Sequence, residues 1–351
     1  MKCDLTNIWY RKTWHILTIL LLPLSGLFGC CVALRRFLYR IGLFKTYHTS
    51  VPVIVVGNLT VGGTGKTPFV MWLADFLKQQ GYRPGIISRG VGGKKQILPH
   101  RVKHDDAATS VGDEALLLAR NTDCPLVICV DRVKALRELL KTTTCNIVIS
   151  DDGLQHYRLG RDMEVVMIDS ERGLGNQCLL PAGPLRESAS RLSTVDMVVK
   201  HGGSDRDQYT MSLIPTECVS VINPERKLPF QSFPRDMIHA VAGIGHPQRF
   251  FSSLKKAGFT IITHAFRDHH AYQPRDFDFA DSLAILMTEK DAVKCAAFAD
   301  ERYWTVRVVA KVNDALKQEI LARLSAWSQP NEYKANGVRV ANDVEYGDFC
   351  G

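Results

Sequence analysis

A glycine-rich segment between an apolar run and a helical pattern constrains this chain more than any other feature. Residues 51–56 form a short β-branched run of the kind buried in a parallel sheet. The sequence then continues as Gly57-Asn-Leu-Thr-Val-Gly-Gly-Thr-Gly-Lys-Thr-Pro68 and leads into apolar residues at helical spacing over 69–77. A strand, a glycine-rich loop and a helix in this order are the context that a phosphate-binding loop requires. The chain is therefore predicted to hold nucleotide phosphates within an α/β fold.

The residue types in the loop fit this chemistry. Glycines allow main-chain N–H groups to surround a phosphate, Lys66 would neutralise the β- and γ-phosphates, and the Thr67 hydroxyl would bind Mg²⁺. Thr60 stands where the general pattern has glycine, and Pro68 excludes a dinucleotide fingerprint. A merely flexible turn is the alternative, but it does not explain Lys-Thr after a buried strand. The expected nucleotide-binding residues are Thr60, Val61, Gly62, Gly63, Thr64, Gly65, Lys66 and Thr67.

Two adjacent carboxylates follow a second apolar run at residues 146–150. Asp151 and Asp152 would lie at the carboxyl end of a parallel strand, where α/β sheets bind ligands. In P-loop enzymes one such aspartate holds Mg²⁺, so we expect Asp151 or Asp152 to face Thr67. The alternative is a turn or helix-capping role.

Further polar residues allow both a catalytic and a structural interpretation. Asp113 and Glu114 begin a helical pattern over 113–120, where acids commonly cap a helix, but Asp113 is also a candidate base and Glu114 a candidate for organising Mg²⁺. Arg186 could stabilise charge on a transferred phosphoryl group or form a surface pair with Glu187.

The N-terminal segment is long and apolar enough to interact with a membrane. Residues 14–34 carry no formal charge and are flanked by basic residues on both sides. About 20 residues can span a bilayer, but Pro23, Gly26 and Gly29 interrupt the run, so an interfacial anchor is equally consistent. A buried helix and a cleaved signal peptide resembling a lipoprotein site at Cys30 are the alternatives.

Charge and cysteine content narrow the class of protein. Residues 1–50 hold seven Lys or Arg against Asp4, which accounts for six of the net charge of +8. The remainder is nearly neutral, so no nucleic-acid partner is expected. The ten cysteines include no C-x-x-C pair and fit a reducing compartment. No obligate protein partner is inferred.

The pattern of apolar runs predicts the domain organisation. Strands near 85–87, 126–130, 164–168 and 196–199 alternate with helical stretches, which favours a doubly wound, mostly parallel sheet over residues 51–229. The pattern restarts at residue 238, so 230–330 is expected to form a smaller α/β domain. We expect residues 1–50 to associate with the membrane and 331–351 to form a polar tail.

Several blocks together resemble one known family, the tetraacyldisaccharide 4′-kinases of lipid A biosynthesis. Besides the loop of residues 57–68, they are Ser88-Arg-Gly90, Gly112-Asp-Glu114, Asp151-Asp-Gly-Leu-Gln-His156, Leu180-Pro-Ala-Gly-Pro-Leu-Arg-Glu187, Asp268-His269 and Met287-Thr-Glu-Lys-Asp-Ala-Val-Lys294. They occur in the family's order, and Thr60 also resembles the family's own form of the loop.

The resemblance implies transfer of the γ-phosphate of ATP to the 4′-hydroxyl of a tetraacyldisaccharide 1-phosphate. The product would be lipid IVA, made at the cytoplasmic face of the inner membrane of a Gram-negative-type cell, with Mg²⁺ as cofactor. The resemblance also implies that Asp113 acts with a histidine of the second domain, which maps to His269, with the neighbouring His270 as the alternative. Lys66 and Arg186 complete the expected catalytic set.

Two other function classes fit a P-loop. A membrane-recruited switch NTPase specific for guanine should carry an [NT]-K-x-D element, but Thr288-Glu-Lys-Asp291 places Lys and Asp side by side. A soluble small-molecule kinase would not need the N-terminal apolar segment.

Overall fold

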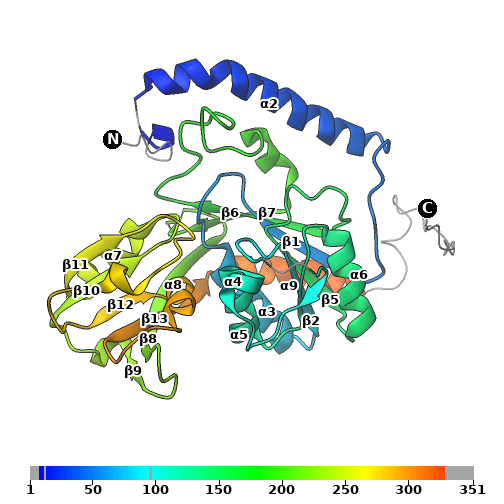
Figure 1. Ribbon diagram of the computed structural model, residues 1–351. Coiled ribbons are helices and arrows are strands. Elements are labelled where there is room, and N and C mark those ends of the chain that lie inside the picture. The colour runs from blue at the N-terminus through cyan, green and yellow to red at the C-terminus, as the bar shows by residue number, and fades with distance from the viewer. Residues whose placement is uncertain (1–7, 12, 95–96, 205, 329–351) are drawn as a thin grey trace.

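The computed structural model describes residues 8–328 except positions 12, 95, 96 and 205. One 13-stranded sheet runs through these residues in the order β11-β10-β12-β13-β8-β7-β6-β1-β5-β2-β4-β3, and β9 pairs with β8. The expected polar tail at 331–351 lies outside the described residues. Two lobes are built on this sheet, and a long helix lies along one side of the larger lobe (Figure 1).

The larger lobe is the doubly wound part that the sequence predicts. Its parallel strands are β1 (Val53–Gly57), β2 (Pro84–Ser88), β4 (Leu126–Ile128), β5 (Ile147–Asp151), β6 (Met163–Asp169) and β7 (Met197–His201), and β3 (His100–Arg101) is antiparallel to β4. The helices of this lobe are α3 (Lys66–Gln79), α4 (Ala108–Val111), α5 (Asp113–Thr122), α6 (Arg132–Thr142) and η1 (Ala189–Thr194).

Burial on both faces explains why β1 is continuously apolar. Ile54 and Val56 pack into one core cluster with residues of α3 and α5, whereas Val53 and Val55 pack into the other with residues of α6. Successive side chains of a strand point to opposite faces, so a sheet covered by helices on both sides has no polar face. The predicted fold class is confirmed, and packing on both faces holds β1 in the centre of the sheet.

The smaller lobe is also an α/β unit. Its strands β10 (Met237–Ala242), β11 (Thr260–Ala265) and β12 (Ile285–Thr288) are parallel. The other elements are β9 (Lys227–Pro229), η2 (Phe230–Ser232), α7 (Pro247–Lys256), η3 (Pro274–Phe277) and α8 (Glu289–Cys295). Two long strands, β8 (Thr210–Ser220) and β13 (Tyr303–Val312), pair with each other and carry the sheet from one lobe into the other.

The return of the chain to the larger lobe differs from the expected arrangement. The helix α9 (Asp314–Ser328) falls within the range 230–330, yet Leu316, Ile320 and Leu324 pack into the same core cluster as α3. Those three leucine or isoleucine positions are spaced by four and so define one helix face. Their packing partner is about 250 positions away in the chain, which local pattern does not reveal.

The N-terminal helix α2 (Ile16–Arg40) is long and mostly exposed. Its two buried residues, Thr18 and Ser25, are polar, whereas large apolar side chains such as Leu20 and Leu27 are exposed. The Ser25 hydroxyl donates to the Leu179 carbonyl at 2.9 Å and accepts from the Ala182 N–H at 2.9 Å. The alternative of a buried core helix is therefore wrong, because the apolar side chains face away from the body.

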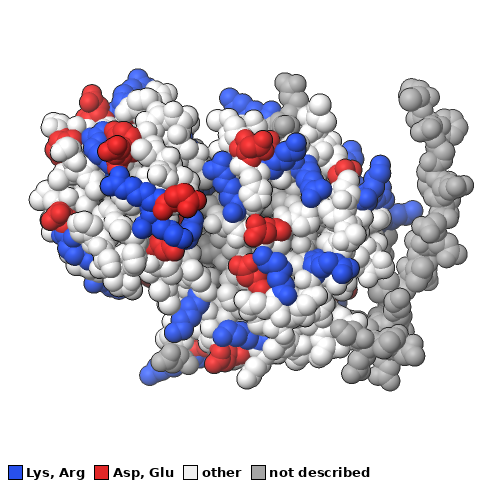
Figure 2. Space-filling view, turned by 90° about the horizontal axis from the view of Figure 1, so that it is seen from below, with Lys and Arg blue, Asp and Glu red and all other residues white. Residues whose placement is uncertain are grey.

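Charged side chains are mixed on the face seen from below. Figure 2 shows acidic and basic groups interspersed over both lobes on that face, with a hollow between the lobes. Charges of both signs close to each other largely cancel at a distance. This face therefore presents no extended surface of a single sign.

Candidate active site

The glycine-rich loop joins β1 to α3 and is shaped by its glycines. Gly62 and Gly65 have φ of 106° and 87°, which L-residues with a side chain rarely adopt. Gly65 is the N-cap of α3, so the amides of the first turn, beginning at Lys66 and Thr67, face the space in front of the loop. The Lys66 ammonium group donates to Asn58 Oδ1 at 3.0 Å and pairs with Asp152 Oδ1 at 3.1 Å. The segment can thus receive phosphate groups next to a cation.

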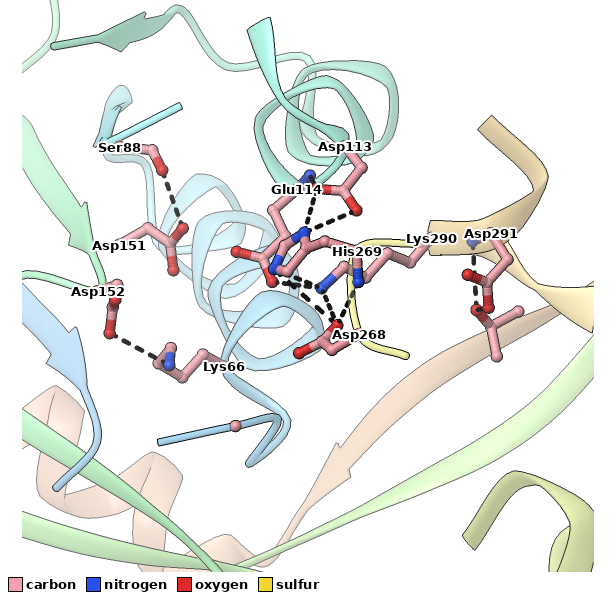
Figure 3. A network of polar contacts seen from close by, with 12 residues as sticks. Lys66, Ser88, Asp113, Glu114, Asp151, Asp152, Asp268, His269, Lys290 and Asp291 are labelled. Atoms are coloured by element: carbon pink, nitrogen blue, oxygen red, sulfur yellow. Dashed lines mark hydrogen bonds and ion pairs between the residues drawn. The ribbon is translucent and has the colours of Figure 1, made fainter. Parts of the chain in front are cut away.

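Asp151 and Asp152 differ in their surroundings although they are adjacent. Asp151 ends β5 and its Oδ2 accepts a hydrogen bond from Ser88 Oγ at 3.1 Å. Asp152 follows in a turn with φ of 47° and pairs with Lys66 (Figure 3). It also pairs with Arg186, whose Nη1 lies 3.0 Å from Oδ1. Burial raises the pKa of Asp152, but the charges of Lys66 and Arg186 outweigh it and hold that pKa well below its usual range. Neither aspartate caps a helix.

Asp151 has the features expected of a metal ligand. Burial, with the nearby charges of Glu114 and Asp152, raises the pKa of Asp151 to about 6. Its Oδ1 is buried and makes no hydrogen bond to any residue that the structure describes. The carboxylates of Asp151, Asp152 and Glu114 repel one another, and Asp151 Oδ1 has no partner in the described part of the chain. This arrangement, beside the loop that carries Thr67, fits an oxygen-binding cation such as Mg²⁺.

The raised pKa leads to a stability prediction. In metal-free protein we expect Asp151→Asn to raise the melting temperature at pH 7.5, because the folded wild type must keep a buried carboxylate charged. The folded pKa exceeds the unfolded one, so this penalty grows as pH rises from about 4 to about 6. Thermal unfolding in the presence of a chelator measures it. At pH 4 the variant should have no advantage, and a destabilised variant at pH 7.5 would contradict the assignment.

Asp113 lies at the first position of α5 and is paired across the two lobes. His269 of the smaller lobe has φ of 59°, and its Nδ1 lies 3.1 Å from both carboxylate oxygens of Asp113 (Figure 3). Burial raises the pKa of Asp113, but the hydrogen bond from His269 and the charges of Lys290 and Lys294 outweigh it and lower that pKa. The hydrogen bond to Asp113 in turn raises the pKa of His269. Asp113 is consequently held as a carboxylate.

Of the two candidate histidines, His269 is the one that contacts Asp113. His270 Nε2 pairs with Asp276 at 3.0 Å within the smaller lobe. The Asp113 side chain also accepts from the Glu114 N–H at 3.0 Å, so it does contribute to the helix start, although Gly112 is the N-cap. Asp113 is therefore not the cap of α5, and its partner in the smaller lobe is His269.

The structure gathers most of the predicted residues on one side of the sheet. Lys66, Asp151 and Asp152 form one group, and Asp113, Glu114 and His269 form a second group contributed by both lobes. Arg186 joins the first group through Asp152. The surface pairing of Arg186 with Glu187 is wrong. Glu187 is buried and accepts a short hydrogen bond from Tyr157, whereas Arg186 pairs with Asp152.

Residues with no predicted role also lie in the site. The Lys290 ammonium group contacts Glu114 Oε1 at 2.9 Å, Asp268 Oδ1 at 3.0 Å and His269 Nε2 at 3.4 Å. Burial lowers the pKa of Lys290, but the charges of Glu114 and Asp268 outweigh it and raise that pKa above its usual range. Position 290 lies in the sequence block 287–294, but only the folding of α8 beside α5 reveals its contacts.

Comparison with known proteins identifies the family of this chain. The family model for Tetraacyldisaccharide-1-P 4'-kinase matches residues 17–325. Relatives named tetraacyldisaccharide 4'-kinase are 51% identical in Methylobacillus flagellatus over 90% of this chain and 96% of that protein. A relative of the same name in Coxiella burnetii is 47% identical over 91% of this chain and 94% of that protein. The solved structure of the "apo" form LpxK from Aquifex aeolicus in complex with ATP is 29% identical, with a TM-score of 0.72, and covers 89% of this chain and 99% of that one.

The fold and the site define an ATP-dependent kinase of the P-loop class. The family match extends across both lobes and includes nearly all of α2. The chain belongs to the tetraacyldisaccharide 4′-kinase family.

Proposed function

We propose that this protein transfers the γ-phosphate of ATP to the 4′-hydroxyl of a tetraacyldisaccharide 1-phosphate and so forms lipid IVA. The observation that carries the proposal is the approach of the Asp113–His269 pair from two lobes toward the P-loop side of the sheet. A switch protein needs no carboxylate–histidine pair beside its phosphate loop, whereas a hydroxyl that attacks ATP needs a proton acceptor.

Asp113 is the proposed proton acceptor. Its pKa is lowered by neighbouring donors and cations, so it remains ionised at neutral pH. With its hydrogen on Nδ1, His269 donates to Asp113, while Nε2 faces the Lys290 ammonium group. This arrangement orients the carboxylate and leaves it able to take the proton of the 4′-hydroxyl. The hydroxyl oxygen bonds to the γ-phosphorus as the bond from that phosphorus to the ADP oxygen breaks.

Lys66 and Arg186 are proposed to carry the charge on the transferred phosphate. Both cations pair with Asp152 Oδ1, Lys66 through Nζ at 3.1 Å and Arg186 through Nη1 at 3.0 Å. Bound phosphates would offer them further anionic partners at the amide-lined loop of residues 60–67.

Mg²⁺ is the proposed metal cofactor. Asp151 and Asp152, with Thr67 and Glu114, form the donor set, and the unpaired Asp151 Oδ1 points to the first of these as the main carboxylate ligand. The ion would neutralise charge shared between the β- and γ-phosphates. Glu114 is already held by Lys290, which favours an outer role for it.

The membrane surface at the cytoplasmic face of the inner membrane is the proposed location. The exposed apolar side chains of α2 include Ile16, Ile19, Leu20, Leu24, Leu27, Leu34 and Phe37. Exposed apolar surface of this extent is unusual on a monomer and fits insertion into the lipid interface. Contacts of Ser25 with the body keep the helix beside the larger lobe, where an acyl-chain substrate would arrive.

The membrane proposal predicts a loss of lipid binding. We expect Leu20→Ser with Leu27→Ser to reduce sedimentation with vesicles of phosphatidylethanolamine and phosphatidylglycerol by at least about tenfold, because each buried leucine contributes about 1.5–3 kcal/mol. The melting temperature should not change, since both residues are exposed. Ile222→Ser, an exposed residue of the other lobe, is the control. Sedimentation equal to wild type would contradict the interfacial role of α2.

One assay tests the reaction itself. Purified protein with γ-labelled ATP, Mg²⁺ and the tetraacyldisaccharide 1-phosphate should place the label in the lipid. Label released only as inorganic phosphate would favour a switch NTPase.

A further inference from the structure

The smaller lobe touches the larger one at a second place, at the phosphate loop itself. There the loop of residues 243–246 lies directly on the P-loop main chain. A Cβ atom added at Gly245 would come within 2.3 Å of the Gly63 nitrogen and 3.1 Å of its Cα. Such a distance is far below ordinary contact, so the two main chains are as close as glycines allow.

Arg249 of α7 connects this loop to the ends of two core strands. Its Nη2 donates to Asp169 Oδ1, at the end of β6, at 2.9 Å. Its Nη1 donates to His201 Nδ1, at the end of β7, at 2.7 Å. His246 Nδ1 lies 3.5 Å from the other Asp169 oxygen. One guanidinium group thus joins three elements, using the planar fork that suits arginine.

His201 lies between Arg249 and the P-loop and contacts both. Its ring is buried, and a Cβ at Gly65 would meet its Nδ1 at 2.7 Å. The ring is also hydrogen bonded to the main chain of Thr64. Burial and the charge of Arg249 lower the pKa of His201 to about 4, so the ring is neutral and accepts the Arg249 hydrogen bond at Nδ1. The single N–H hydrogen of the neutral His201 ring is therefore on Nε2.

The negative charge of Asp169 is balanced by Arg249. Burial raises the pKa of Asp169, but the hydrogen bond from His246 and the charge of Arg249 outweigh it and lower that pKa to about 2. Its Oδ1 also accepts from the N–H groups of Glu171 and Arg172. The carboxylate is thus a fixed anchor at the sheet edge to which Arg249 is attached.

We propose that Arg249 is a positioning residue for nucleotide binding, which holds Thr64 and Gly65 through His201 and keeps the 243–246 loop against Gly63. The smaller lobe would then act on the site through two separate contacts. His269 orients the acceptor base, and Arg249 supports the amides that receive the phosphates. Removing Arg249 should weaken ATP binding without affecting the lipid substrate.

The test compares two variants that disturb this contact in different ways. Arg249→Ala removes the bridge, and Gly245→Ala adds a methyl group that must push the lobe from the P-loop. We expect each to raise the KM for ATP by about tenfold, corresponding to a loss of ~1.4 kcal/mol, with the KM for the lipid unchanged. Arg249→Lys should be intermediate, because one ammonium group can hold Asp169 but not His201 as well.

Binding of ATP to the full-length protein without lipid, measured by calorimetry, gives a readout independent of the kinase reaction. The control is Arg302→Ala in the same lobe, where the guanidinium group pairs with the exposed Asp300. An unchanged KM for ATP in both variants, or an equal rise in the KM for lipid, would overturn the proposal. If Arg249→Ala does not fold, His201→Gln and Gly245→Ala decide the question by the same two measurements.

Discussion

Replacing Lys66 with alanine is expected to lower phosphoryl transfer by about 10²-fold or more, because one preorganised group facing developing charge commonly contributes that much. Lys66 is the first residue of α3, and its ammonium group lies between Asn58 and Asp152 at the phosphate loop. The variant should also bind ATP more weakly, since the lysine contributes to both the bound and the reacting state.

The matched control for this change lies on the same helix. Lys78 is near the end of α3, where it pairs with Asp75 at 2.8 Å on the surface. Lys78→Ala removes the same side chain type from the same helix and should leave transfer within about twofold of wild type, as surface pairs contribute little. Transfer by Lys66→Ala at the rate of the control would rule out its place in the reaction.

Replacing Asp113 with asparagine is expected to lower kcat by roughly 10²- to 10⁴-fold, the range for loss of a general base. Asparagine keeps the size of the side chain and an oxygen that can accept from His269, but it cannot take a proton. ATP affinity should be nearly unchanged, because Asp113 lies on α5 and not in the phosphate loop. Single-turnover transfer of labelled phosphate and calorimetry of ATP binding separate the two effects.

An acid of the smaller lobe controls for loss of a charge. Asp300 is half-exposed and pairs with Arg302, and its replacement with asparagine should not change kcat. A second variant, His269→Gln, should also lower kcat, though less than Asp113→Asn, because it removes the group that orients the base. Wild-type turnover in Asp113→Asn would show that another group accepts the proton.

Much of the larger lobe could be predicted from the sequence because its signals are local. The β-branched runs that become β1 and β5, and the glycines before α3, depend on neighbours within a few residues. Asp151 and Asp152 can be placed at a strand end because they directly follow the apolar run of residues 146–150. The family resemblance added His269, which no local pattern assigns.

The remaining features depend on segments far apart in the chain. Lys290 meets Glu114 across 176 positions, and Arg249 meets Asp169 across 80. The packing of α9 on the larger lobe and the burial of Glu187 also depend on distant partners. Contact between such residues follows from how helices close on a sheet, which the spacing of residues does not specify.

The sequence by itself determined the chemistry available to this protein, namely a loop for phosphates, carboxylates at strand ends and an apolar segment long enough to interact with a membrane. These properties follow from the local conformations of glycine, the alternation of a strand and the length of an uncharged run. Only the tertiary structure decided which groups work together. It paired His269 with Asp113 and Arg249 with Asp169 and His201, and it turned Thr18 and Ser25 of α2 inward. Burial and the pairing of charges are settled only when the lobes pack.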